Sequence, residues 1–87
     1  MSEPLDGTPK DLPATVLRLW REALGVHDAG PDDDFFELGG DSLVATRLVA
    51  LLRMELGLAV PLLAVFDNPT AAELTLELEQ AAAGAAR

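Results

Sequence analysis

The residue with the clearest potential for chemistry is a serine, Ser42, that follows two glycines and an aspartate. It lies in the run Leu38–Leu43 (LGGDSL), where the most apolar helix-like segment of the chain begins. Glycine can adopt φ > 0, so the pair suits a tight turn into a helix. Unpaired N–H groups and the positive end of the helix dipole meet at such a start, which would favour a phosphate attached to the Ser42 oxygen. Asp41 and Ser42 are also ordinary capping residues, so the motif alone leaves a plain helix cap open.

Other chemistries fit this serine and its acidic neighbours poorly. A serine hydrolase usually places its nucleophile in G-x-S-x-G with a base nearby, whereas Val44 occupies the second glycine position and the only histidine, His27, lies upstream in a predicted loop. A phosphate-cradling loop needs a lysine, but the only lysine is Lys10. An EF-hand alignment that starts at Asp28 puts Asp33 where the loop requires glycine. We therefore expect no catalytic residue and no metal site, but a serine that another protein modifies.

The charge of the chain is strongly acidic, with 15 Asp and Glu against 6 Lys and Arg and a net charge of −9. This balance repels nucleic acid and anionic membrane surfaces, and it favours partners that present Lys and Arg. One stretch that leads to Ser42 contains acids and no Lys or Arg: Asp28, Asp32, Asp33, Asp34, Glu37 and Asp41. The stretch either steers a partner toward the serine or only keeps a loop soluble.

The size of the chain, 87 residues, allows one small domain with little room for a substrate cavity. No cysteine is present, so packing alone must stabilise the fold. Apolar stretches fall short of a membrane span, and no secretory signal is evident. We expect a cytoplasmic monomer without a membrane partner.

Two segments show apolar residues at helical spacing. The first follows the capping residue Asp11 and ends at Gly25, and the second spans residues 42–56 and ends at Gly57. Between them lies a long loop in which one of two adjacent phenylalanines should anchor the chain in the core. The predicted core residues of the two helices are Leu12, Val16, Leu17, Trp20, Ala23 and Leu24, then Ala45, Leu48, Val49, Leu52 and Leu56.

The last part of the chain predicts a short helix or turn over residues 62–66 and a final helix through about Gln80. Thr70 and Glu73 form a capping-box signature for that helix, and Leu74, Leu76 and Leu78 should supply its apolar contacts. We expect residues 1–10 to be a flexible linker, residues 11–80 to be the folded domain, and residues 81–87 to be a tail that frays or prolongs the helix.

The motif around Ser42 resembles the peptidyl carrier, or thiolation, domains of nonribosomal peptide synthetases. The run Asp34–Leu43 is similar to the family pattern x-F-F-x-L-G-G-[HD]-S-L at every fixed position, and two weaker matches follow at 45–48 and 60–70. The resemblance covers Leu12 to Leu78. It implies an acyl-carrier-like bundle of three main helices plus one short helix.

The resemblance also implies a function. A phosphopantetheinyl transferase, using coenzyme A and magnesium, would attach phosphopantetheine to Ser42, which Gly40 and Asp41 precede. The thiol of that arm would hold an aminoacyl or peptidyl group as a thioester for adenylation, condensation, epimerisation, thioesterase or tailoring enzymes in antibiotic or secondary-metabolite biosynthesis. The positions that resemble partner contacts are Leu43, Thr46 and Ala50, with Arg47 beside them.

Two alternatives stay open at this point. Asp41 stands where many peptidyl carriers have histidine, and aspartate also precedes the serine in acyl carriers of polyketide and fatty acid pathways. The other alternative is a helical protein-interaction module in which Ser42 is unmodified.

Overall fold

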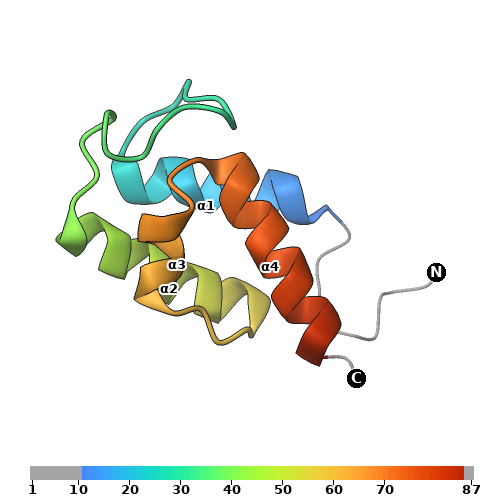
Figure 1. The fold of residues 1–87 in the computed structure, drawn as a ribbon. Coiled ribbons are helices and arrows are strands. Elements are labelled where there is room, and N and C mark those ends of the chain that lie inside the picture. The colour runs from blue at the N-terminus through green and yellow to red at the C-terminus, as the bar shows by residue number, and fades with distance from the viewer. Residues whose placement is uncertain (1–10, 86–87) are drawn as a thin grey trace.

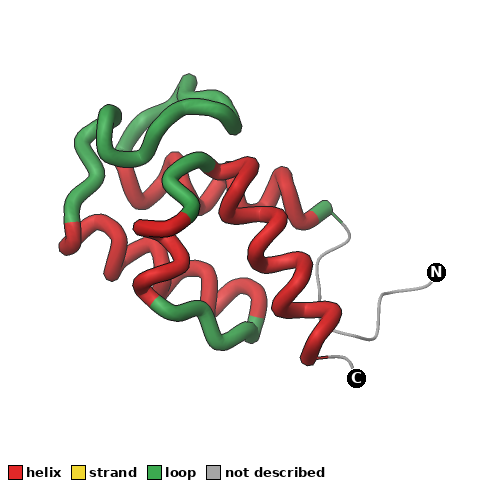
Figure 2. Tube along the Cα trace, viewed as in Figure 1, coloured by secondary structure: helices red, strands yellow, loops and turns green. Residues whose placement is uncertain are grey.

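Four α-helices make up the fold of residues 11–85, the part of the chain that the computed structural model describes. They are α1 (Leu12–Leu24), α2 (Ser42–Leu56), α3 (Leu62–Asp67) and α4 (Ala71–Ala85). Within the described residues no strand forms, as Figure 2 shows, so the predicted all-α class is confirmed. α1 packs against α2 and α4, and the short α3 contacts α2 and α4 (Figure 1). The predicted linker, residues 1–10, and residues 86–87 of the tail lie outside the described residues.

The first helix begins and ends where its capping signals predict. The Asp11 carboxylate accepts the N–H of Ala14 at 3.3 Å, and Gly25 ends the helix at φ 74°. Leu17 and Leu24, predicted in the core, are only partly buried, because each lies at the border of the apolar stripe. The buried residues of α1 are Leu12, Val16, Leu19, Trp20 and Ala23.

The second helix has the predicted bounds and the predicted core. Its buried residues are Ala45, Leu48, Val49, Leu52 and Leu56, and Gly57 ends it in the left-handed region at φ 69°. Because these residues recur at three- and four-residue spacing, they form one stripe that faces α1 and α3. The other face of α2 is therefore left to solvent.

The last helix begins at the predicted capping box and continues into the tail, one of the two predicted alternatives, but one predicted core residue is wrong. Thr70 Oγ1 accepts the N–H of Glu73 at 3.1 Å, and Glu73 Oε1 accepts the N–H of Thr70 at 3.4 Å. α4 continues past Gln80 to Ala85. Leu74 and Leu78 are buried, but the prediction for Leu76 is wrong, since its side chain is 59% exposed. Two residues along a helix turn the chain by about 200°, so Leu76 lies opposite Leu74.

The long loop between α1 and α2 is anchored in the core by Phe35, as predicted for one of the two phenylalanines. Phe35 is fully buried, and its ring lies 6.0 Å from that of Trp20. Its N–H donates to the carbonyl of Pro69 at 2.8 Å, and Ala72 N–H donates to the carbonyl of Pro31 at 2.9 Å. The loop is thus tied to the junction of α3 and α4, over which it arches in Figure 1.

None of the helices in the described part of the chain is both long enough and apolar enough to cross a membrane.

Candidate functional site

Ser42 is the first residue of α2, and its side chain is exposed. Asp41 precedes it in an extended conformation and caps the helix, because its Oδ1 accepts the N–H of Val44 at 3.0 Å. The Ser42 carbonyl accepts a hydrogen bond from Thr46 Oγ1 at 2.8 Å. In Figure 1 the green start of α2 lies at the edge of the molecule, where the loop enters the helix. The serine hydroxyl is therefore accessible to another protein.

The two glycines before this serine are required for different reasons. Gly39 has φ 100°, a conformation that residues with a Cβ rarely adopt. Gly40 instead lies against Phe35: a Cβ added there would come within 2.3 Å of two ring atoms and 2.7 Å of the Phe35 carbonyl oxygen. Gly40 N–H also donates to that carbonyl at 2.9 Å. The sequence predicts backbone freedom at both glycines, but at Gly40 the structural requirement is close approach to a buried ring.

The surroundings of Ser42 fit an extended group joined to its oxygen. An open cleft of about 400 Å³ begins one residue further along α2 and is lined by Leu43, Val44, Thr46 and Arg47. The Asp41 carboxylate already accepts the N–H of Val44 at the start of α2. A phosphate on Ser42 would therefore lie beside this carboxylate at the positive end of the helix dipole. The site thus offers an exposed attachment point with open space beside it rather than an enclosing pocket.

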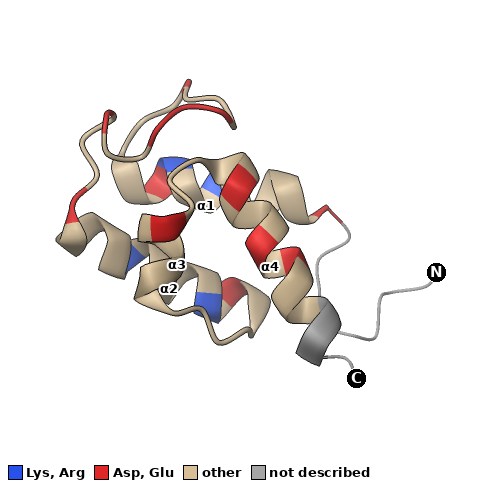
Figure 3. Cartoon of the chain, viewed as in Figure 1, with Lys and Arg blue, Asp and Glu red and all other residues tan. Residues whose placement is uncertain are grey.

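The acidic stretch before Ser42 shapes the loop through hydrogen bonds of its carboxylates. Asp33 Oδ2 accepts the N–H of Gly30 at 2.8 Å, and Asp34 Oδ1 accepts the N–H groups of Phe36 at 2.8 Å and Glu37 at 3.2 Å. Asp34 thus bonds N–H groups two and three residues further on, whereas Asp33 bonds one three residues back. Aspartates that bond nearby backbone N–H groups are common turn formers, a signal that the sequence interpretation missed. Figure 3 shows the acidic residues along the loop and at the start of α2, and the described basic residues on the helices.

The outer face of α2 is exposed along its whole length. Leu43 is 79% exposed, and Thr46, Arg47 and Ala50 are also exposed, as predicted. Met54, two turns beyond Arg47, is 84% exposed. The residues predicted to contact partners therefore share one accessible face that begins beside Ser42.

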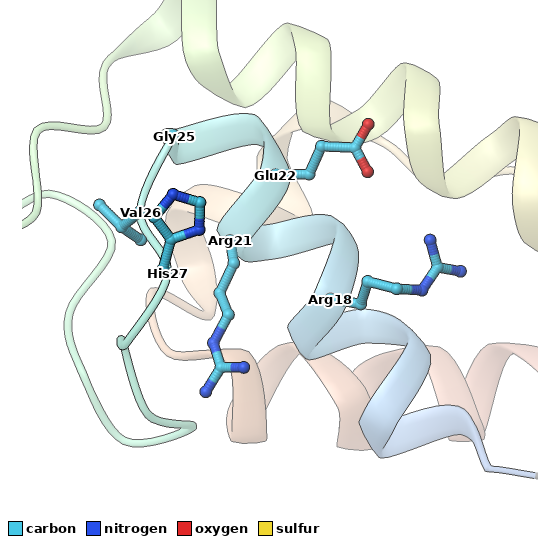
Figure 4. A pocket seen from close by; sticks show the side chains of 6 residues that line it. All are labelled: Arg18, Arg21, Glu22, Gly25, Val26 and His27. Atoms are coloured by element: carbon cyan, nitrogen blue, oxygen red, sulfur yellow. The ribbon is translucent and has the colours of Figure 1, made fainter.

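A larger open cavity of about 690 Å³ lies at the C-terminal end of α1. Its lining is Arg18, Arg21, Glu22, Gly25, Val26 and His27. The charged side chains point apart, with Arg21 on one side and Arg18 and Glu22 on the other (Figure 4). Arg21 Nε donates to the carbonyl of Ala29 at 2.7 Å, and Arg18 pairs with Glu55 at 3.0 Å. Arg18 and Arg21 thus make contacts within the fold and do not converge on a ligand. His27 is exposed on the surface.

This chain is similar to known proteins in both sequence and fold. The family model described as "Phosphopantetheine attachment site" matches residues 14–78. Surfactin synthase subunit 2 of Bacillus subtilis is 41% identical over 71 residues, which cover 82% of this chain and 2% of that protein. The chain therefore spans a small fraction of the length of this curated relative.

Two solved structures have the same fold. The structure titled "Non Ribosomal PCP domain" is 34% identical with a TM-score of 0.68, and the match covers 87% of this chain and 92% of that chain. A chain in the structure of the phosphopantetheine transferase Sfp in complex with coenzyme A and a peptidyl carrier protein is 28% identical with a TM-score of 0.74, covering 84% and 96%.

The matched segment contains α2, the glycines before it and the exposed Ser42, so sequence and fold agree on one assignment. The resemblance drawn from the motif is confirmed, as is the expectation of a non-catalytic carrier that uses phosphopantetheine. The chain belongs to the phosphopantetheine attachment family and is a carrier domain of the nonribosomal peptide synthetase type.

Proposed function

We propose that Ser42 is the residue to which phosphopantetheine is attached, and that the thiol of the arm carries an aminoacyl or peptidyl group as a thioester in nonribosomal peptide-type biosynthesis. The observation that carries this proposal is the exposed serine at the first position of α2, inside the segment that matches the family. Gly40 and Asp41 shape the backbone that presents it. A cytoplasmic location is part of the same proposal.

In the chemical step of the modification, the Ser42 hydroxyl is the only group of this chain that reacts. The Ser42 oxygen bonds to the phosphorus that bears the pantetheine half of coenzyme A, and the bond from that phosphorus to the bridging pyrophosphate oxygen breaks. Adenosine bisphosphate leaves, and the hydroxyl proton passes to a base of the transferase. No side chain with an ordinary general-base role needs to lie beside Ser42, because the partner enzyme supplies the catalysis.

We infer that partners dock on the outer face of α2. Leu43 offers an exposed apolar side chain next to Ser42, and Thr46, Arg47 and Ala50 continue the same face. One partner is the transferase, since a similar chain is part of a complex with the transferase Sfp. The others are the adenylation, condensation, epimerisation, thioesterase or tailoring enzymes with which carriers of this type exchange their cargo.

A mass measurement tests the attachment. The protein is incubated with coenzyme A and Sfp, and the intact mass should rise by one phosphopantetheine. Ser42→Ala should abolish the gain. Ser2→Ala is the matched control, because Ser2 is the only other serine in the chain, and this variant should be modified like the wild type. An unchanged mass of the wild-type protein would instead favour an interaction module with an unmodified serine.

A loading assay distinguishes the peptidyl carrier from the polyketide-type or fatty acid-type acyl carrier. Adenylation enzymes charge a carrier of the first type with amino acids, so the modified protein should accept an aminoacyl group from such an enzyme. Loading with simple acyl groups alone would assign the chain to the other branch.

The acidic stretch should speed the encounter with the transferase. Exposed charges are screened over about 10 Å at 0.1 M salt, so kcat/KM of the modification should fall as salt rises. Glu37→Gln, near the serine in sequence, should reduce this salt dependence, whereas Glu79→Gln, on the exposed surface of α4, should leave it unchanged. A rate that does not respond to salt would refute the steering role and leave the attachment site untouched.

A further inference from the structure

We propose that Phe35 is a positioning residue for the modification of Ser42, because its ring is the surface on which Gly40 rests. A Cβ on Gly40 would lie 2.3 Å from ring atoms Cδ2 and Cε2 of Phe35, closer than any packed side chain tolerates. The Gly40 backbone therefore packs so closely on this ring that no side chain fits between them. The inference rests on the proposed attachment at Ser42.

The ring of Phe35 is itself fixed from several sides. It is fully buried. Its centroid lies 6.0 Å from that of the Trp20 ring of α1 and 5.4 Å from that of the Phe36 ring, which it meets edge to face. Phe36 in turn stacks on Phe66 of α3 at 5.5 Å. Phe35 N–H is held by the carbonyl of Pro69, just before α4. The position of the Phe35 ring, on which Gly40 packs, is thus set by contacts with α1, through Phe36 with α3, and with the residue just before α4.

Backbone hydrogen bonds hold the segment between Phe35 and Gly40 in a turn beside the Phe35 ring. Residues 34–40, which we call the glycine turn, include bonds from Gly40 N–H to the Phe35 carbonyl at 2.9 Å and from Leu38 N–H to the Asp34 carbonyl at 3.2 Å. Only Asp41 separates Gly40 from Ser42, and its carboxylate is bound to Val44 N–H at 3.0 Å. The exposed Ser42, the first residue of α2, is in this way held at a fixed position relative to the core.

A fixed hydroxyl matters because the transfer needs its oxygen in line with the bond that breaks. A displacement of about 1 Å from the reactive geometry can cost on the order of 100-fold in rate. Gly40→Ala must move either the ring or the turn, since both the ring and the Phe35 carbonyl block the new Cβ. The outer face of α2, which we assign to partner docking, does not include this contact. The variant should therefore lower kcat of the modification more than it raises KM.

The experiment measures kcat and KM for modification by Sfp with coenzyme A, on the full chain, for the wild type and three variants. Gly40→Ala adds the blocking Cβ, and Phe35→Leu keeps an apolar side chain but removes the flat ring. Val16→Ala is the control, because Val16 is fully buried in α1 and not part of the glycine turn. Urea unfolding of each variant gives its stability, so that all rates are measured where the protein is folded.

Gly40→Ala and Phe35→Leu should each lower kcat by about 10- to 100-fold. Val16→Ala should leave kcat within about two-fold of the wild type even if it loses as much stability, because it alters packing and not the position of Ser42. If the folded Gly40→Ala protein is modified with the wild-type kcat, or if Val16→Ala slows kcat equally, the positioning role is refuted. A wild-type chain that gains no phosphopantetheine would refute the proposed function instead, so the two failures are distinguishable.

Discussion

Asp41 combines two roles that a pair of substitutions can separate: it caps α2, and it places a negative charge beside Ser42. Asp41→Ala removes the hydrogen bond to Val44 N–H at 3.0 Å. Loss of such a cap costs about 1 kcal/mol, within a range of about 0.5–2. For a domain of this size, 1 kcal/mol lowers Tm by about 4–8 °C. Asn caps a helix about as well as Asp, so Asp41→Asn should lose only the interaction of the charge with the helix dipole, about 0.3 kcal/mol at an exposed site.

Urea unfolding followed by circular dichroism measures these differences. Asp11→Ala is the matched control, because Asp11 caps α1 through a longer bond of 3.3 Å to Ala14 N–H. It should cost no more stability than Asp41→Ala, and it should leave modification of Ser42 unchanged. If Asp41→Asn is destabilised as much as Asp41→Ala, the charge and not the hydrogen bond supports the helix start. If neither variant is destabilised, the reasoning from cap geometry is wrong.

Three further predictions concern the fold around the site. Leu74→Ala should cost about 2–5 kcal/mol because Leu74 is fully buried, whereas Leu76→Ala on the exposed face should change stability by less than about 0.5 kcal/mol, both measured by urea unfolding. Arg18→Ala should cost less than about 1 kcal/mol, since both side chains of the Arg18–Glu55 pair are about half exposed, and a double-mutant cycle with Glu55→Ala measures the pair directly. Thr70→Ala should cost about 1 kcal/mol through loss of the 3.1 Å cap of α4, and a thermal scan that shows no decrease in Tm would contradict it.

The start of α2 at Ser42 could be predicted because its signals are local. A cap, a glycine that ends a helix and an apolar stripe each involve residues within a few positions of one another, so the bounds and the core of α2 were predicted in full. The same local signals predict a helix start at Ser42, and the motif around it indicates the family.

Other features depend on residues that are distant in sequence. The apolar spacing in α4 suggested Leu76 as a core residue, but which stripe of that helix is buried is decided by the position of α1 and α3 against it. In α1, likewise, Leu19 is buried while Leu17 is only partly so. Periodicity predicts that a buried face exists, and packing between helices selects its centre.

The sequence by itself determined that this chain forms helices, where α2 begins, and that a serine preceded by two glycines and an aspartate stands there. That the serine is exposed is shown by the structure. Only the tertiary structure shows why Gly40 is needed: the Phe35 ring packs against it. That ring is placed there by its contact with Trp20 of α1 and by the bond from Phe35 N–H to the carbonyl of Pro69 before α4. Hydrogen bonds across three or four residues can be predicted from neighbours in the chain. The Phe35 ring packs on Trp20 of α1 while its backbone is bonded to Pro69 before α4, so its position is set only when these distant segments have packed together.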